Sequence, residues 1–196
     1  MQACMQMILN YFYPKKKFSI KKLSELLRIK NKKMYCFPEM TVAVLSDLGI
    51  NAKYYTTSDD IKWYKEGKKY LLENYPKQVA EDIWKMSNLK ISKPFFKKVL
   101  KEKRYIHKKL SFEDIKKFFK KGYLISPVIN INVFEKRKGY SGHAILITDI
   151  NKKFVTFHDP GLPPIPNSKI SKQNFIRAWQ SPGTDNTIIV VFGKKK

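Results

Sequence analysis

Residues 139–167 read GYSGHAILITDINKKFVTFHDPGLPPIPN, and this stretch decides the predicted fold. Residues 144–150 and 154–157 are rich in apolar and β-branched side chains, which is the composition of strands. The connection 149–153 between them is short enough for an antiparallel hairpin. Residues 160–167 are rich in proline and predict a loop. Two paired strands followed by a loop are therefore expected here.

Upstream of this stretch the apolar residues recur at helix spacing, and downstream the chain returns to strand composition. Helix starts are marked by Ser19, Ser111 and Ser171 as N-caps and by Pro38 in a first turn, and Gly49 is a stop signal. The predicted helices cover residues 1–13, 19–27, 38–48, 61–75, 76–86, 94–103, 111–121 and a segment after Ser171, and the other predicted strands cover 51–56, 124–134 and 187–192. Helices first and strands second predict the α+β class, with N-terminal helices packed on a C-terminal antiparallel sheet.

Length and composition predict a chain that folds alone as one domain, residues 1–196. The chain has 196 residues, of which 43% are hydrophobic and 14% aromatic, enough apolar surface to build a core. No apolar run reaches the ~18–20 residues of a membrane span, and no secretion signal precedes the first helix, so we expect a cytoplasmic protein without a membrane partner. The two cysteines, Cys4 and Cys36, form no CxxC pair, which disfavours a disulfide scaffold or a structural zinc site.

The charge is strongly positive: 40 Lys and Arg against 16 Asp and Glu give +24. The lysines occur as short pairs and triplets scattered along the chain, mostly on the polar sides of amphipathic segments. This pattern favours a solvated surface over a dedicated polyanion site, because a nucleic-acid face concentrates basic and aromatic residues on one element. Nucleic-acid binding is expected to be weak, salt-sensitive and non-specific.

Three residues form a candidate catalytic set: Cys4 near the start of the first helix, His143 on a strand, and Asp159 at the end of the next strand. A thiolate is stabilised near a helix N-terminus, an imidazole completes the ion pair, and a carboxylate holds the imidazole in one tautomer. Each residue also has an ordinary structural interpretation. Cysteines on apolar helix faces are usually packing residues, a histidine at a strand start is often only half-buried, and Asp-Pro-Gly is a strong turn signal.

The other two histidines are not expected to act. His158 points to the opposite side of its strand from Asp159, so it is interpreted as structural. The same alternation separates the ligands of a metal site built from His143, His158 and Asp159. His107 lies among lysines and is interpreted as a surface residue. We expect no metal and no cofactor.

The run 139–167 resembles the histidine and aspartate strands of papain-superfamily cysteine peptidases of the bacteriocin-leader-processing, double-glycine type. The opening helix QACMQMILNYF resembles the nucleophile helix of that family, and the similarity extends over residues 111–133 and 171–179. The resemblance implies a papain-like fold and a thiol peptidase. Residues 58–110 have no counterpart in the family and are interpreted as a helical insertion.

The resemblance departs from the family at the nucleophile. The family's cysteine is followed by glycine, a variable residue and alanine, and aligning Ala3 and residues 7–9 to this pattern puts Met1 at the glycine. The nucleophile would then precede residue 1, together with a glutamine that helps to form the oxyanion hole. Three alternatives follow: a translation start assigned too late, a relative that has lost catalysis, or a shifted register in which Cys4 is the nucleophile.

The functional expectation is a cysteine peptidase-like hydrolase acting on a peptide or amide bond, with His143 as base and then acid and Asp159 orienting it. The first alternative is a non-catalytic relative that binds a peptide or an acidic partner in the same cleft, and the second is weak nucleic-acid binding. We also predict that the Cys4 sulfur lies beyond about 5 Å from the His143 ring, against ~3–3.5 Å for a working contact.

Overall fold

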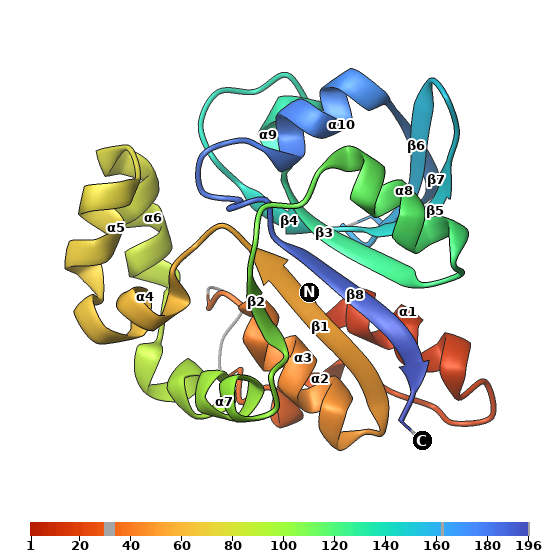
Figure 1. The fold of residues 1–196 in the computed structure, drawn as a ribbon, viewed down its shortest axis with the longest axis horizontal. Coiled ribbons are helices and arrows are strands. Elements are labelled where there is room, and N and C mark those ends of the chain that lie inside the picture. The colour runs from red at the N-terminus through yellow and green to blue at the C-terminus, as the bar shows by residue number, and fades with distance from the viewer. Residues whose placement is uncertain (30–33, 162, 196) are drawn as a thin grey trace.

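The computed structural model describes residues 1–29, 34–161 and 163–195, and within them the chain is an α+β protein, as predicted. Helices precede most of the strands along the chain (Figure 1). The helices are α1 (Gln2–Phe12), α2 (Ile20–Leu26), α3 (Pro38–Asp47), α4 (Asp60–Glu66), α5 (Lys68–Asn74), α6 (Lys77–Met86), α7 (Leu89–Lys101), α8 (Phe112–Lys120), α9 (Ile131–Phe134) and α10 (Lys172–Trp179). The strands are β1 (Ile50–Thr56), β2 (Tyr105–His107), β3 (Leu124–Asn130), β4 (Gly142–Ala144), β5 (Leu146–Ile150), β6 (Phe154–Asp159), β7 (Ile165–Ser171) and β8 (Ile188–Lys194).

The described strands form two sheets rather than the single antiparallel sheet that was predicted. The larger sheet has the order β2-β1-β8-β3-β4, and the smaller has the order β5-β6-β7. All pairings are antiparallel except β1 with β2, which is parallel. β1 comes from the helical first half of the chain and pairs with the last strand, β8, so both halves of the sequence contribute to the larger sheet (Figure 1).

Two hydrophobic clusters lie on opposite faces of the larger sheet. Along β8, Ile189 and Val191 belong to the cluster that the N-terminal helices build, whereas Ile188 and Val190 belong to the cluster under α8, α10 and the smaller sheet. This alternation is the period of two that a strand buried on both faces requires. The larger sheet therefore separates the two parts of the core.

Capping residues were predicted well. The side chains of Ser19, Ser111 and Ser171 accept backbone N–H groups at the starts of α2, α8 and α10. Ser111 forms a reciprocal capping box with Asp114. Gly49 follows α3 with a φ of +79°, the left-handed conformation that ends helices.

The predicted helix over residues 61–75 is wrong as one piece, because Gly67 has a φ of +59° and divides it into α4 and α5. α7 begins five residues earlier than predicted. The Asn88 side chain accepts a hydrogen bond from the backbone N–H of Ile91 and so caps α7. Pro94 therefore lies inside the helix. A proline there removes one intrahelical hydrogen bond, and burial of Phe95 and Phe96 on the same helix offsets that loss.

One predicted strand is too long, and two further strands lie where none was predicted. The strand predicted over residues 124–134 ends at Asn130, whose side chain accepts the backbone N–H of Asn132 and starts the short helix α9. β2 lies in a segment for which no strand was predicted. β7 includes residues 165–167 of the predicted loop, because Ile165 pairs with Asp159 across the smaller sheet.

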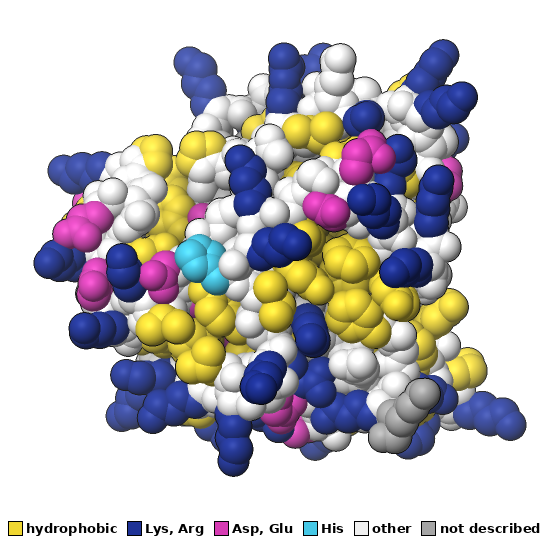
Figure 2. Space-filling model, in the orientation of Figure 1, with side chains coloured by type: hydrophobic (Ala, Val, Ile, Leu, Met, Phe, Trp, Pro, Cys, Tyr) yellow, Lys and Arg dark blue, Asp and Glu magenta, His cyan; other side chains and the backbone are white. Residues whose placement is uncertain are grey.

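Among the residues that the structure describes, no helix combines the length and apolar composition needed to cross a bilayer. The basic side chains are distributed over the whole visible face rather than gathered on one element (Figure 2). This distribution agrees with the solvated surface that the sequence predicts.

Candidate functional site

His143 and Asp159 are in direct contact. The Nε2 atom of His143 lies 2.6 Å from Oδ1 of Asp159, and the two side chains are 24% and 11% exposed. Because an ionised carboxylate only accepts hydrogen bonds, Nε2 carries the proton and Nδ1 is left as the basic nitrogen of the neutral ring. The backbone N–H of Gly161 donates to the same Oδ1 at 2.8 Å and fixes the carboxylate.

The two members of this pair belong to different sheets. β4 carries His143 and pairs with β3, whereas Asp159 ends β6 in the smaller sheet. The chain passes from one sheet to the other at Ile145, whose N–H donates to Pro127 of β3. One residue later, Leu146 pairs with His158 of β6. The sequence prediction of neighbouring strands in a single sheet is therefore wrong, although the two side chains do meet.

His143 opens onto a cavity of about 250 Å³. Met1 and Gln2, at the N-terminus of α1, line the same cavity, as do Gly142 and Ala144 beside the histidine. Other walls come from β1 and β3, from the start of α3 and the segment before it, from helices α4–α6 and from the loop before β8. The start of α1 and the imidazole thus face one space, the arrangement that a helix-activated nucleophile requires.

Cys4 lies one turn into α1 and does not line this cavity. Its side chain is fully buried, and Sγ donates to the carbonyl oxygen of Ala144 at 3.3 Å. Burial raises the pKa of Cys4 above its ordinary value. The thiol is therefore adjacent to the strand that carries His143, but in an environment that favours the neutral, unreactive form.

Cys36 is the other free cysteine, and it does line the cavity. Its Sγ lies 3.6 Å from the Thr41 hydroxyl oxygen. Burial raises the pKa of Cys36 to about 11, so its thiol is also mainly protonated near neutral pH.

Tyr140 lies across two glycines at the edge of the cavity. Its hydroxyl donates to the carbonyl oxygen of Gly183 at 2.6 Å. A Cβ atom at Gly142 would lie 2.5 Å from the Tyr140 oxygen, and one at Gly183 would lie 2.9 Å from Val79 of α6. Only glycine at these two positions allows the ring to pack so closely.

Three carboxyl groups that the sequence prediction missed also line the cavity: Glu39 and Asp60, which are buried, and Asp185, which is partly exposed. Each accepts a hydrogen bond from a tyrosine hydroxyl. Tyr64 donates to Glu39, Tyr54 donates to Asp60 at 2.9 Å, and Tyr75 donates to Asp185 at 2.8 Å. These pairs join helices α4 and α5 to α3, to β1 and to the loop before β8.

Burial raises the pKa of all three carboxyl groups, to about 8 for Glu39, about 7 for Asp60 and about 6 for Asp185. Glu39 is an acidic residue in the first turn of α3, a common position for such residues, so nothing in the local sequence indicates that it is buried. Two features of the sequence could have indicated the buried carboxyl groups of Glu39 and Asp60. Acidic residues are rare in the chain, and these two have aromatic neighbours in residues 35–40 and 59–64.

The remaining histidines take structural positions. His158 Nδ1 accepts the backbone N–H of Asn167 at 3.2 Å and so helps to pair β6 with β7. His107 is exposed, and its Nε2 lies 3.1 Å from the carbonyl oxygen of Thr57. Within the described part of the chain, no three His, Cys, Asp or Glu side chains are grouped so that they could hold a metal ion.

Comparison of the chain with protein-family models and with curated proteins finds no match.

Proposed function

We propose that the cavity beside His143 is the substrate site of a papain-like thiol hydrolase acting on a peptide or amide bond. The observation that carries the proposal is the 2.6 Å contact between His143 and Asp159, next to the N-terminus of α1 and open to the cavity. The division of the core into a helical part and a part with the smaller sheet is compatible with a papain-like fold.

In the proposed reaction, Nδ1 of His143 takes the proton of a thiol, and the thiolate forms a bond to the substrate carbonyl carbon. The oxyanion collapses, the C–N bond breaks, and His143 returns the proton to the leaving amine. Water, deprotonated by His143, then attacks the thioester and releases the carboxylic acid and the thiol. Asp159 stays ionised throughout, accepts the hydrogen bond of Nε2–H and orients the imidazole.

The proposed place for an attacking thiol is the N-terminus of α1, beside Met1. Two observations support this position over Cys4: Met1 and His143 line one cavity, and Cys4 is buried with a raised pKa. In this proposal Cys4 packs α1 against β4 and positions the helix.

The proposal is tested with a chain that carries one cysteine directly ahead of Met1, treated with iodoacetamide and followed by peptide mass at each cysteine. We expect the added cysteine to react at least about tenfold faster than Cys4 and Cys36, since its thiolate would pair with His143. His143→Ala should remove this advantage, and Asp159→Asn should reduce it. Equal, slow labelling with and without the imidazole would contradict a catalytic pair.

A second candidate is a non-catalytic relative that binds a peptide in the same cavity. The burial of Cys4 favours it, because that thiol is poorly placed to react. The labelling experiment separates the two: slow labelling at every cysteine, with peptide binding retained, supports the binding protein.

A further inference from the structure

Seven aromatic Phe, Trp and Tyr residues of the described chain line the cavity that His143 faces, and three of them belong to the insertion over residues 58–110. The aromatic residues there, besides Tyr140, are Tyr35, Phe37, Tyr54, Trp63, Tyr70 and Tyr75. Trp63 packs against Phe37 and Tyr70, with ring centroids 6.3 Å and 6.4 Å apart. Aromatic rings around a cavity attract cations through their negative faces.

The side chains of this wall are acidic in composition, whereas the chain as a whole is basic. Lys and Arg account for 40 of 196 residues, yet none of the described residues that line the cavity is Lys or Arg. Three of the 16 acidic residues do line it: Glu39, Asp60 and Asp185. Glu39 is 3% and Asp60 8% exposed, so both carboxyl groups are held away from bulk water.

The tyrosine hydroxyls leave these carboxyl groups able to bind a further donor. A carboxylate offers about four acceptor positions, and Tyr54 and Tyr75 each engage one oxygen of Asp60 and Asp185. A cation in the cavity would favour the ionised form of these carboxyl groups and add a charge-assisted hydrogen bond in a poorly hydrated space, where such bonds are strongest.

We infer that this aromatic and acidic wall is a subsite for the cationic side chain of a peptide, a lysine or an arginine close to the bond that His143 faces. The inference rests on the proposed function for its peptide ligand. The cavity, at about 250 Å³, is smaller than the about 300–1,000 Å³ of sites for whole small-molecule ligands, which suits a single side chain. The insertion supplies part of this subsite, including Asp60 and Trp63.

Binding of matched peptides to the wild-type chain tests the inference by isothermal titration calorimetry. The probes are acetylated, amidated Gly-Gly-Lys-Gly-Gly and the same peptide with norleucine in place of lysine, which removes the charge and keeps the alkyl chain. We expect the lysine peptide to bind about tenfold or more tightly. Equal affinity of the two peptides, or binding of neither, overturns the inference.

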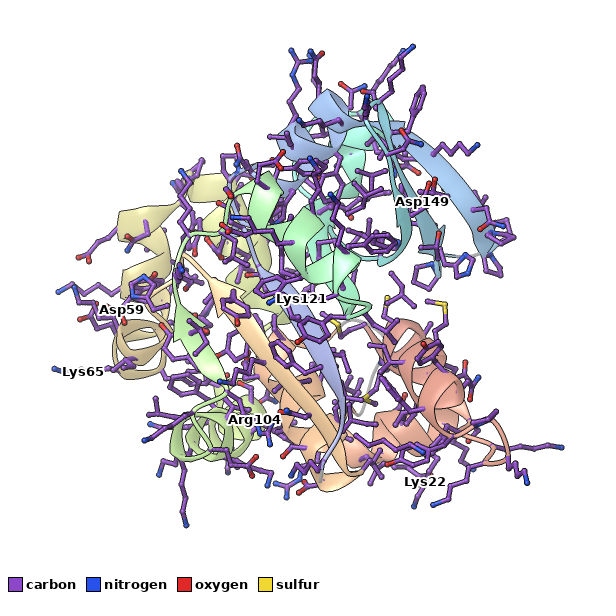
Figure 3. The ribbon with its side chains drawn as sticks, turned by 45° about the vertical axis from the view of Figure 1, so that its right-hand side comes forward. Lys22, Asp59, Lys65, Arg104, Lys121 and Asp149 are labelled. Atoms are coloured by element: carbon purple, nitrogen blue, oxygen red, sulfur yellow. The ribbon has the colours of Figure 1, made fainter. Side chains whose placement is uncertain are left out.

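Asp60→Asn should reduce the affinity for the lysine peptide and leave the norleucine peptide unchanged. The matched control is Asp149→Asn, because Asp149 is exposed on the smaller sheet, far from α4 and α5 (Figure 3). If the Asp60→Asn variant binds the lysine peptide as tightly as the wild-type chain does, the carboxyl groups only stabilise the packing of the cavity wall. That result would overturn the inference.

Two further arms identify the ligand and separate this inference from the proposed function. n-Butylammonium chloride binding as tightly as the lysine peptide would assign the subsite to a free amine and overturn the peptide part. Lysine selectivity with slow thiol labelling contradicts the hydrolase and keeps the subsite. Fast, His143-dependent labelling without lysine selectivity supports the hydrolase and overturns the subsite.

Discussion

His143 and Asp159 show what single residues reveal in a sequence. The spacing of Gly-His and His-Asp-Pro-Gly placed an imidazole and a carboxylate at strand ends, and the two side chains do meet at 2.6 Å. Glu39, Asp60 and Asp185 were not identified, because nothing local marks an acidic residue as buried. Their burial depends on contacts between helices far apart in the sequence, which periodicity does not report.

Glu39→Gln is predicted to change how stability depends on pH. Burial raises the pKa of Glu39 to about 8, against about 4.3 in an unfolded chain, so the folded state holds the proton more tightly. The folded protein therefore loses stability as pH rises from about 4 to about 8. Glutamine does not titrate, and it can still accept the Tyr64 hydroxyl.

Relative to wild type, the unfolding free energy of Glu39→Gln should rise by roughly 3–4 kcal/mol between about pH 5 and pH 8. Urea unfolding at the two pH values measures this difference. Asp149→Asn, on the exposed surface, serves as the control and should show little change. The prediction is wrong if the difference between Glu39→Gln and wild type is the same at both pH values.

Elements were predictable where their signals are local. Serine caps, a first-turn proline and a terminal glycine located α2, α3, α8 and α10. β2 and β7 were missed for a tertiary reason: β2 exists because residues 105–107 pair with β1, and β7 because residues 165–171 pair with β6. Strand pairing overrides a proline-rich composition when the strand lies at a sheet edge, as β7 does.

Gly142→Ala is predicted to disturb β4 by displacing Tyr140. The new Cβ atom would lie 2.5 Å from the Tyr140 hydroxyl oxygen, which requires the ring to move and weakens its hydrogen bond to Gly183. We expect a loss of about 1–3 kcal/mol in the free energy of unfolding, measured with urea. In a Tyr140→Ala background the same substitution should cost little, and an equal cost in both backgrounds would contradict this account.

At the scale of the whole molecule, the sequence predicted the α+β class but not the division into two sheets. The reason lies at Ile145: residues 144–150 have uniform strand composition, and only the pairing of β4 with β3 and of β5 with β6 divides them. The surface was predictable from charge. Lysines scattered in sequence are also scattered over the visible face (Figure 2).

Binding to polyanions is predicted to be weak and purely electrostatic. With a net charge of +24 spread over the surface, a single-stranded oligonucleotide should bind at low salt and dissociate by about 0.3 M salt. Fluorescence anisotropy over a salt series measures this. Retention of the oligonucleotide above that concentration would indicate a dedicated nucleic-acid site.

The passage of the chain from one sheet to the other at Ile145 couples the imidazole to the assembly of the fold. His143 is carried by the larger sheet and Asp159 by the smaller, so a separation of the two sheets would pull the pair apart and open the hydrophobic cluster to which both sheets contribute. On heating, the imidazole should therefore lose its carboxylate partner in the same transition in which that cluster melts. The contact between His143 and Asp159 therefore reports whether the two sheets are docked.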